Sequence, residues 1–381
     1  MTVNSNSTKT SRRFLAPFFK GLKWAWLVMT IVTALLTIIS ANSGFFNPEN
    51  FPLPSLLAMA FPGFIILNVI FGIINLFINR WVAIVQWVAL ICSISAIANW
   101  FPVHPLASTP GFGSNDKLIR FMSFNTYGFV DNEEIYPDST NRSATAIIKS
   151  KADIICLQEV GRLFDLPLRF LTDQQIDSIN NIYPYFASED EKLVSILSKY
   201  PLKEISLQQP PSPHSGWQAA EVYIGNDTIL VVSVHLQSFG LDDSDKVLFH
   251  KITDGDVSTN MTDAGKIILR KLVNAFRLRA KQAQLLRHQL DSLNYNNVIL
   301  SGDFNDISNC YPIRTISGEK MKSVYREIAT GPIITYHRDR FFFNIDHTLY
   351  QGKNLVPIRY RRGNIKCSDH YPVFVSFKLD N

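Results

Sequence analysis

Polar side chains that can bind metals or transfer protons follow several short apolar runs of this sequence. Asn125 follows the first run, and Glu159 follows the second in Leu-Gln-Glu. His235 ends Val-Ser-Val-His, and Ser-Gly-Asp-Phe-Asn-Asp places Asp303 and Asn305 after another run. Because ligands gather beyond the strand ends of α/β sheets, this repeated placement predicts one convergent site. Two more pairs join the set near the C-terminus, Asp346 with His347 and Asp369 with His370.

The residue types in this set indicate hard-oxygen metal chemistry. Several carboxylates with asparagine oxygens and no thiolate suit Mg²⁺ or Mn²⁺ rather than structural zinc. Such an ion neutralises phosphate charge and acidifies a bound water, while a histidine stabilises an oxyanion or donates a proton. The four cysteines show no CxxC or other metal-ligand spacing. Taken singly, an Asp or Asn after a strand is more often a turn or cap residue, so the prediction depends on the ordered set.

Short β-branched runs predict the strands that would position these residues. Apolar residues alternate in Leu118–Phe124, which is typical of a strand. Apolar residues from Leu269 to Leu293 follow mostly three- and four-residue steps, which predicts one long helix. About 265 residues are available here, a length that suits one α/β domain. The other predicted strands are Asp153–Leu157, Val194–Leu197, Ile229–Val234, Val298–Ser301 and Val373–Phe377.

In this order, the motifs resemble those of the endonuclease/exonuclease/phosphatase superfamily, which has the DNase I-like fold. The resemblance extends over roughly Leu118 to Phe377 and ends with Ser-Asp-His-Tyr-Pro just before the last predicted strand. Each motif is short, but five in the same order are specific. The resemblance implies an α/β four-layer sandwich with two central mixed β-sheets flanked by helices. It also implies a metal-dependent phosphoesterase, here a membrane-anchored bacterial member.

The resemblance implies three residues on the metal side of the site. Glu159 matches the family's principal metal ligand, and Asn125 matches its neighbour. Asp369 matches a second carboxylate on the metal side. The implied cofactor is Mg²⁺ or Mn²⁺.

Five further residues match catalytic positions of the family. Asp303 matches the aspartate that orients or deprotonates the attacking water, and Asn305 matches the asparagine that holds the phosphate and that water. His370 matches the histidine that stabilises pentacovalent phosphorus, and Asp346 matches the acid that fixes its imidazole. His235 matches a second histidine seen in the DNase I-like, sphingomyelinase-like and inositol-phosphatase-like branches. The implied mechanism is in-line attack by water without a covalent intermediate.

The substrate class stays open between two phosphate esters. A nuclease-like phosphodiesterase is slightly favoured, because a basic cluster leads into the Ser-Asp-His loop and could bind flanking phosphates. The predicted substrate-binding residues of this cluster are Arg359, Arg361 and Arg362. A solvated surface strand explains the same cluster. The stretch 237–271 departs from the family as an insertion, and insertions near the site choose the substrate in this family.

The alternative substrate is a phospholipid headgroup, as in sphingomyelinases, or a small phosphate ester. A membrane anchor favours a lipid because it raises the effective concentration of headgroups. The run Phe341–Phe343 fits either a contact with a bilayer or a core strand. A catalytically silent binding module is the third hypothesis, against which the retained histidines and carboxylates argue.

The first 103 residues predict a membrane anchor, because three runs approach the roughly 20 apolar residues that span a bilayer. Residues 104–116 are rich in proline and glycine and predict a linker, and residues 117–381 then form the catalytic domain. The three predicted transmembrane helices are Leu22–Ala41, Ser55–Ile78 and Trp81–Trp100.

The charges of the anchor predict its orientation. Of the 37 basic and 32 acidic residues of the chain, residues 1–103 contain six basic residues and one acidic residue. The excess of positive charge therefore lies in the anchor, and the catalytic domain is neutral, which does not favour non-specific binding to nucleic acid. By the positive-inside rule, the N-terminus and Arg80 face the cytoplasm. This predicts a multi-pass protein of an inner or plasma membrane with an extracytoplasmic catalytic domain.

Overall fold

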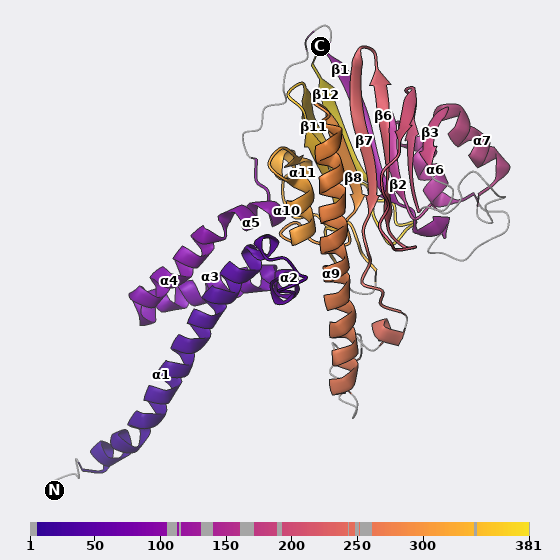
Figure 1. The fold of residues 1–381 in the computed structure, drawn as a ribbon. Coiled ribbons are helices and arrows are strands. Elements are labelled where there is room, and N and C mark those ends of the chain that lie inside the picture. The colour runs from indigo at the N-terminus through magenta and orange to yellow at the C-terminus, as the bar shows by residue number, and fades with distance from the viewer. Residues whose placement is uncertain are drawn as a thin grey trace.

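The computed structural model contains an N-terminal group of helices that meets one side of an α/β body (Figure 1). The structure describes residues 6–104, 113, 116–130, 140–160, 171–188, 193–242, 244–247, 251, 261–338 and 341–380. Most of the predicted linker and part of the 237–271 insertion lie outside these residues. The domain boundaries at 104 and 117 stay predictions, although the last helix of the anchor ends at Trp100 and the first strand begins at Lys117.

Two long apolar helices dominate the N-terminal region. Pro17–Ala41, within α1, and Phe61–Ile78, which is α3, are each long and apolar enough to cross a membrane. Both expose many large apolar side chains, which is expected of surfaces that face lipid. The helical elements of this region are α1 (Asn6–Ala41), η1 (Ser43–Phe45), α2 (Leu53–Met59), α3 (Phe61–Ile78), α4 (Arg80–Cys92) and α5 (Ile94–Trp100).

The third predicted transmembrane helix is broken. Helices α4 and α5 meet at an angle of 58° and count as a span only if the bent pair is taken as one, so the described residues contain two continuous spans rather than three. The break is at Ser93, whose hydroxyl donates to the carbonyl of Ala89, a bond that often bends helices. The second span also begins later than predicted, because Pro62 in the first turn starts α3 as a new helix after α2.

Two six-stranded mixed sheets form the body, as predicted. In each sheet one central pair is parallel, β1 with β2 and β7 with β8, and the other pairs are antiparallel. The first sheet has the order β11 (Leu355–Arg362), β12 (Val373–Leu379), β1 (Lys117–Asn125), β2 (Ile154–Gln158), β4 (Val194–Ser198) and β3 (Tyr185–Ser188). The second has the order β5 (Leu202–Ile205), β6 (Gly216–Ile224), β7 (Asp227–His235), β8 (Val298–Asp303), β10 (Asp346–Gln351) and β9 (Lys322–Ser323).

The alternation of side chains along each strand divides the apolar residues between two faces. In β1, Ile119 and Phe121 point into the core between the sheets, whereas Met122 and Phe124 belong to the cluster on the outer face of the first sheet. The outer face of the second sheet is covered by α9 through Ala283 and the leucines that follow it. These layers confirm the four-layer sandwich. The helices of the body are η2 (Tyr127–Phe129), α6 (Arg142–Lys149), α7 (Asp173–Ile182), α9 (Met261–Leu293), α10 (Tyr311–Ser317) and α11 (Val324–Ile328).

The anchor packs directly against the body. Ala58 of α2 is fully buried in a cluster with Ile307, Cys310 and Ile345 of the catalytic domain. Ser43 donates to the carbonyl of Asn309 over 2.7 Å. These contacts involve the end of the bundle that holds η1, α2 and α5, and α3 runs from there to the turn before Arg80 (Figure 1). The body and the Arg80 turn thus lie at opposite ends of the bundle, while the orientation in a membrane stays a prediction.

Candidate active site

The register of the second sheet brings three predicted catalytic residues side by side on adjacent strands. Asp303 is the last residue of β8, and it pairs with His235 at the end of β7 and with Asp346 at the start of β10. The tight approach of β8 to β7 requires glycine before Asp303, because a Cβ on Gly302 would lie 1.9 Å from the Val234 carbonyl oxygen. Strand pairing therefore positions Asp303 with a histidine and an acid beside it.

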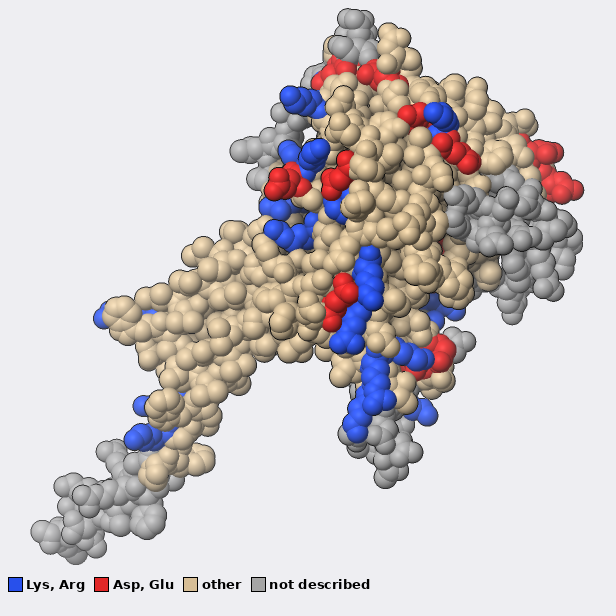
Figure 2. Space-filling model, in the orientation of Figure 1, with Lys and Arg blue, Asp and Glu red and all other residues tan. Residues whose placement is uncertain are grey.

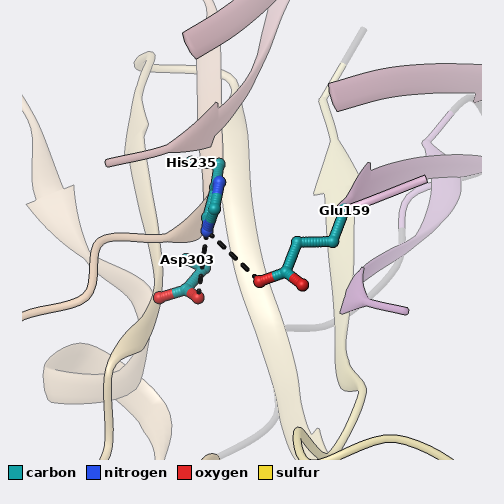
Figure 3. Close-up of side chains that lie close together, drawn as sticks. All are labelled: Glu159, His235 and Asp303. Atoms are coloured by element: carbon teal, nitrogen blue, oxygen red, sulfur yellow. Dashed lines mark ion pairs between the residues drawn. The ribbon is translucent and has the colours of Figure 1, made fainter. Parts of the chain in front are cut away.

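The first sheet contributes Asn125 and Glu159 from the ends of β1 and β2. The Asn125 amide donates to the Glu159 carboxylate over 2.9 Å and to the Asp303 carboxylate over 3.0 Å. His235 Nε2 lies 3.5 Å from Glu159 Oε1 and 3.7 Å from Asp303 Oδ2, so Glu159, His235 and Asp303 face one point between the sheets (Figure 3). The site is thus built where the strand ends of both sheets meet.

His370 approaches Asp303 from the loop before β12. Its Nδ1 lies 2.8 Å from Asp346 Oδ2, and its Nε2 lies 3.5 Å from Asp303 Oδ2. The backbone amide of His370 donates to the hydroxyl of Ser368, which itself donates to the carbonyl of Asn125. Asp346 therefore orients the imidazole, and Ser368 ties the loop to the first sheet.

Asn305 completes the group on the other side of Asp303. Its backbone amide donates to Asp303 Oδ1 over 2.7 Å, and its side-chain nitrogen lies 3.3 Å from His235 Nε2. Both Asn305 and Glu159 have left-handed backbones, with φ of 51° and 53°. Such conformations are uncommon outside glycine and cluster at functional sites, where the surrounding contacts stabilise them.

The two histidines have opposite charge preferences. Burial lowers the pKa of His235 and favours its neutral form. Burial also opposes the charge of His370, but the carboxylates of Asp346 and Asp303 outweigh it and raise the pKa of His370 well above its usual value. Neighbouring groups with separated pKa values are typical of acid–base sites. His370 is thus suited to stabilise negative charge, and His235 to accept a proton or hydrogen bond.

The carboxylates need a positive partner. Burial raises the pKa of Asp303 to about 6 despite the neighbouring histidines, and burial also raises the pKa of Glu159. Two groups of side chains could hold an ion, Glu159 with His235 and Asp303, and Asp303 with Asp346 and His370. The positive end of the Asn125 amide already bridges Glu159 and Asp303, as a cation would. An oxygen-rich donor set of this kind fits Mg²⁺ or Mn²⁺.

Asp369 lies beside this centre, whereas the three predicted substrate-binding arginines lie outside it. Asp369 lines the cleft described below but belongs to neither group of potential metal ligands. Arg359 and Arg361 are exposed on the edge strand β11, and Arg362 stacks on the ring of Tyr371. None of the three lines the cleft, because β11 is separated from the centre of the first sheet by β12.

The sequence match decides the family. The chain matches the Endonuclease/Exonuclease/phosphatase family over residues 122–370, which include every predicted catalytic and metal-ligating residue named above. The chain belongs to this family. Its members are typically hydrolytic phosphoesterases. Residues 22–100 match a family described only as a domain of unknown function, and no curated protein matches the chain.

Solved structures of similar fold include a family member from Beutenbergia cavernae, which is 17% identical with a TM-score of 0.48 over 69% of this chain and 72% of that one. Truncated TDP2 from Caenorhabditis elegans is 17% identical with a TM-score of 0.45 over 68% of this chain and 97% of that one. Sphingomyelinase C from Streptomyces griseocarneus is 15% identical with a TM-score of 0.39 over 70% of this chain and all of that one. Similarities this low say nothing of the substrate.

Several of the predicted site residues line a cleft of about 500 Å³. Glu159, Asp303 and His370 line one part of it, and apolar side chains line much of the rest. Phe341 and Phe343 contribute to this apolar lining, and only Phe342 between them is exposed. The Phe341–Phe343 run is therefore not a strand of the core, since Phe343 forms only an isolated bridge with Tyr336.

Part of the cleft wall comes from outside the family segment. Leu56, Met59 and Ala60 line the cleft, although they belong to α2 and its end in the anchor. The 237–271 insertion contributes as well, through residues 238–241 and Ile268. The insertion was detectable in the sequence as a departure from the family pattern, but no sequence pattern indicated that α2 would contribute.

A buried ion pair joins helix α9 to the loop that follows β8. Arg279 of α9 is fully buried, and its Nε lies 3.1 Å from Asp306, three residues after Asp303. Its guanidinium also donates to the carbonyl of Gln237. Sequence analysis missed Arg279, because helical spacing places it within an apolar face without showing its partner.

Proposed function

We propose that this chain is a divalent-metal-dependent phosphoesterase that cleaves phosphodiester bonds by in-line attack of water. The observation that carries the proposal is the position of Asp303. Its carboxylate lies 3.7 Å from the neutral-favouring His235 and 3.5 Å from the cationic-favouring His370. A carboxylate between two histidines of opposite charge preference can take a proton from water on one side while positive charge faces the phosphate on the other.

The residues have the following roles in this proposal. Asp303 accepts the proton of the attacking water, whose oxygen forms the new bond to phosphorus as the bond to the leaving group breaks. Asn305 orients the water and a phosphate oxygen. The imidazolium of His370, held by Asp346, stabilises the negative charge that develops on phosphorus oxygens. His235 remains neutral and fixes Asn305 and the carboxylates.

The metal site in this proposal comprises Glu159, Asn125 and Asp369, with Asp303 close by. Asn125 would turn its amide oxygen toward the ion, since the two ends of an amide are assigned by their hydrogen bonds. A bound Mg²⁺ or Mn²⁺ supplies Lewis acidity and neutralises phosphate charge.

The lining of the cleft supports one of the two substrate classes more than the other. The nuclease-like prediction, favoured from the sequence, depended in part on Arg359, Arg361 and Arg362, which do not line the cleft. The apolar lining of the cleft instead favours an ester with a hydrocarbon group. A silent binding module is disfavoured, because burying several acids and histidines costs folding free energy that a protein without catalytic activity has no reason to spend.

The test is hydrolysis of bis(4-nitrophenyl) phosphate by the full chain in detergent, with Mg²⁺, Mn²⁺ or EDTA. We expect turnover that EDTA abolishes and that Glu159→Ala lowers by about 10²–10³, the usual effect of removing one electrostatic stabiliser. Glu319→Ala is the matched control, because Glu319 is exposed beyond α10. Turnover that persists unchanged in Glu159→Ala would reject the proposal.

A further inference from the structure

We infer that the substrate is the phosphate ester of a membrane lipid, whose hydrocarbon chain lies against a wall that the protein's own anchor supplies. This inference rests on the proposed function and identifies its substrate class. The anchor would then be a part of the substrate site as well as a tether.

The wall is composed of segments that are distant in the sequence. Leu56 and Met59 come from α2, and Ile268 and Leu272 come from the first turns of α9. With Phe341 they line the same cleft as Glu159 and His370. The cleft therefore has a polar part, suited to a phosphate, and an apolar part, suited to aliphatic or aromatic groups.

The position of α2 places this wall at the membrane surface. Helix α2 lies between the end of α1 and the start of α3, the two helices that are able to cross a membrane. Phe51, just before this helix, and Leu53, its first residue, expose more than half of their surface. Because Ala58 packs into the body while Leu56 and Met59 face the cleft, the spanning helices hold the cleft at the level where lipid headgroups begin.

A lipid fits this cleft better than a nucleic acid does. Each methylene that leaves water for an apolar wall contributes about 0.8 kcal/mol, which a sugar–phosphate backbone cannot gain. Nucleic-acid binding instead needs a basic surface along the strand. Among the residues that the structure describes, Lys246 is the only lysine or arginine in the cleft lining.

The outer face of α9 supports the same position of the bilayer. Figure 2 shows basic side chains along this helix beside the anchor. Arg270, Arg277 and Lys281 are exposed at spacings that place them on one face, opposite the side of the half-buried Leu272. Lys281 lies 3.8 Å from Glu49 of the loop before α2, so this face points toward the anchor. A basic face at this level suits anionic headgroups.

The test is photo-crosslinking of the full chain in lipid nanodiscs. The probe is a phosphatidylglycerol with a diazirine at the end of one acyl chain, and the Glu159→Ala variant is used so that the ester stays intact. Mass spectrometry should find adducts on peptides that contain Leu241, Ile268 or Phe341. Adducts confined to Pro17–Ala41 and Phe61–Trp100 would overturn the inference.

A matched pair of variants tests the wall itself. Leu56→Asn should lower the yield of cleft adducts by about tenfold, because it replaces the apolar side chain of a half-buried leucine in the cleft wall by a polar one. Leu53→Asn on the same helix should leave the yield unchanged, since Leu53 does not line the cleft. Equal yields in the two variants would contradict the inference.

The outcome is separable from that of the proposed function. Hydrolysis of the soluble diester without cleft adducts would reject the lipid substrate and keep the phosphoesterase. Cleft adducts without hydrolysis of any ester would keep the lipid site and reject the phosphoesterase.

Discussion

The polar and apolar parts of the cleft are built in different ways. The polar part consists of strand ends, in which sheet register sets Asp303 beside His235 and Asp346, and buried hydrogen bonds fix each side chain. The apolar part consists of α2, the 237–271 insertion and the start of α9, which no sheet register aligns.

This difference teaches how one fold can serve several substrates. The polar part lies within residues 122–370, the segment that belongs to the family. Leu56 and Met59 lie in residues 22–100, which match another family. In the proposed function, chemistry is thus a property of the sandwich, and we infer that selectivity comes from the segments added to it.

Arg279→Met should have the largest effect, because it breaks the contact that joins the two parts. Removing one partner of a buried ion pair costs about 3–5 kcal/mol, since Asp306 would remain buried and charged. Thermal unfolding of the full chain in detergent would measure the loss. The double variant Arg279→Met with Asp306→Asn should recover part of it, and a double variant as unstable as the single one would contradict the explanation.

His370→Ala should lower the rate of phosphate-ester hydrolysis without changing the preference between a lipid and a soluble substrate. We expect kcat to fall by about 10²–10³ on a soluble diester and on a lipid ester alike, because the imidazolium acts on the phosphate that both share. Stopped assays on both substrates would check this. His288→Ala is the control, since His288 is exposed on α9. A loss on only one substrate would show that His370 contacts the leaving group instead.

Leu272→Asn should weaken the preference for a lipid substrate without lowering the rate of hydrolysis of a soluble diester. Loss of one apolar leucine contact in the cleft wall should lower the ratio of lipid to soluble turnover by about tenfold. The measurement is kcat/KM for each substrate in the same nanodisc preparation. Leu269→Asn, at an exposed position that does not line the cleft, serves as the control. An unchanged ratio in Leu272→Asn would mean that the apolar part plays no role in binding.

Charge reversal on the outer face of α9 should have the smallest effect. Each basic residue near an anionic surface contributes about 1 kcal/mol, so Arg270→Glu or Arg277→Glu should weaken the dependence of lipid turnover on anionic lipid by about fivefold or more. Turnover would be followed as the anionic fraction of the nanodisc rises. Arg326→Glu, on α11, is the control, and an equal effect there would indicate general electrostatics.

The elements of the sandwich were largely predictable. The runs Leu118–Phe124 and Val298–Ser301 lie within β1 and β8, and the periodic segment that ends at Leu293 forms α9. These predictions succeed because the alternation of apolar residues is local and matches the faces that become buried. The helix break at Ser93 was missed, because apolar composition does not report a side chain that bonds to its own backbone.

The sequence predicted which residues belong to the site, but it did not predict how they are arranged in space. The order of the motifs identified Glu159, Asp303 and His370, whose roles stay predictions. The order of the motifs could not predict the positions of Arg359 and Arg361. Residues close to a catalytic motif in sequence can lie on an edge strand outside the cleft, as these two do. Ser368 was inside a quoted motif, yet its bond to the Asn125 carbonyl required the loop to meet the first sheet.

By itself, the sequence determined the family and the two-sheet fold and predicted the residues for phosphate chemistry, since these are recorded in local patterns and their order. Only the tertiary structure decided that His235 and His370 differ in charge preference, because burial and the distances to Asp346 and Asp303 set their pKa values. Only the tertiary structure brought Leu56 of the anchor to the cleft. That contact arises from packing between segments about two hundred residues apart, for which no local pattern exists.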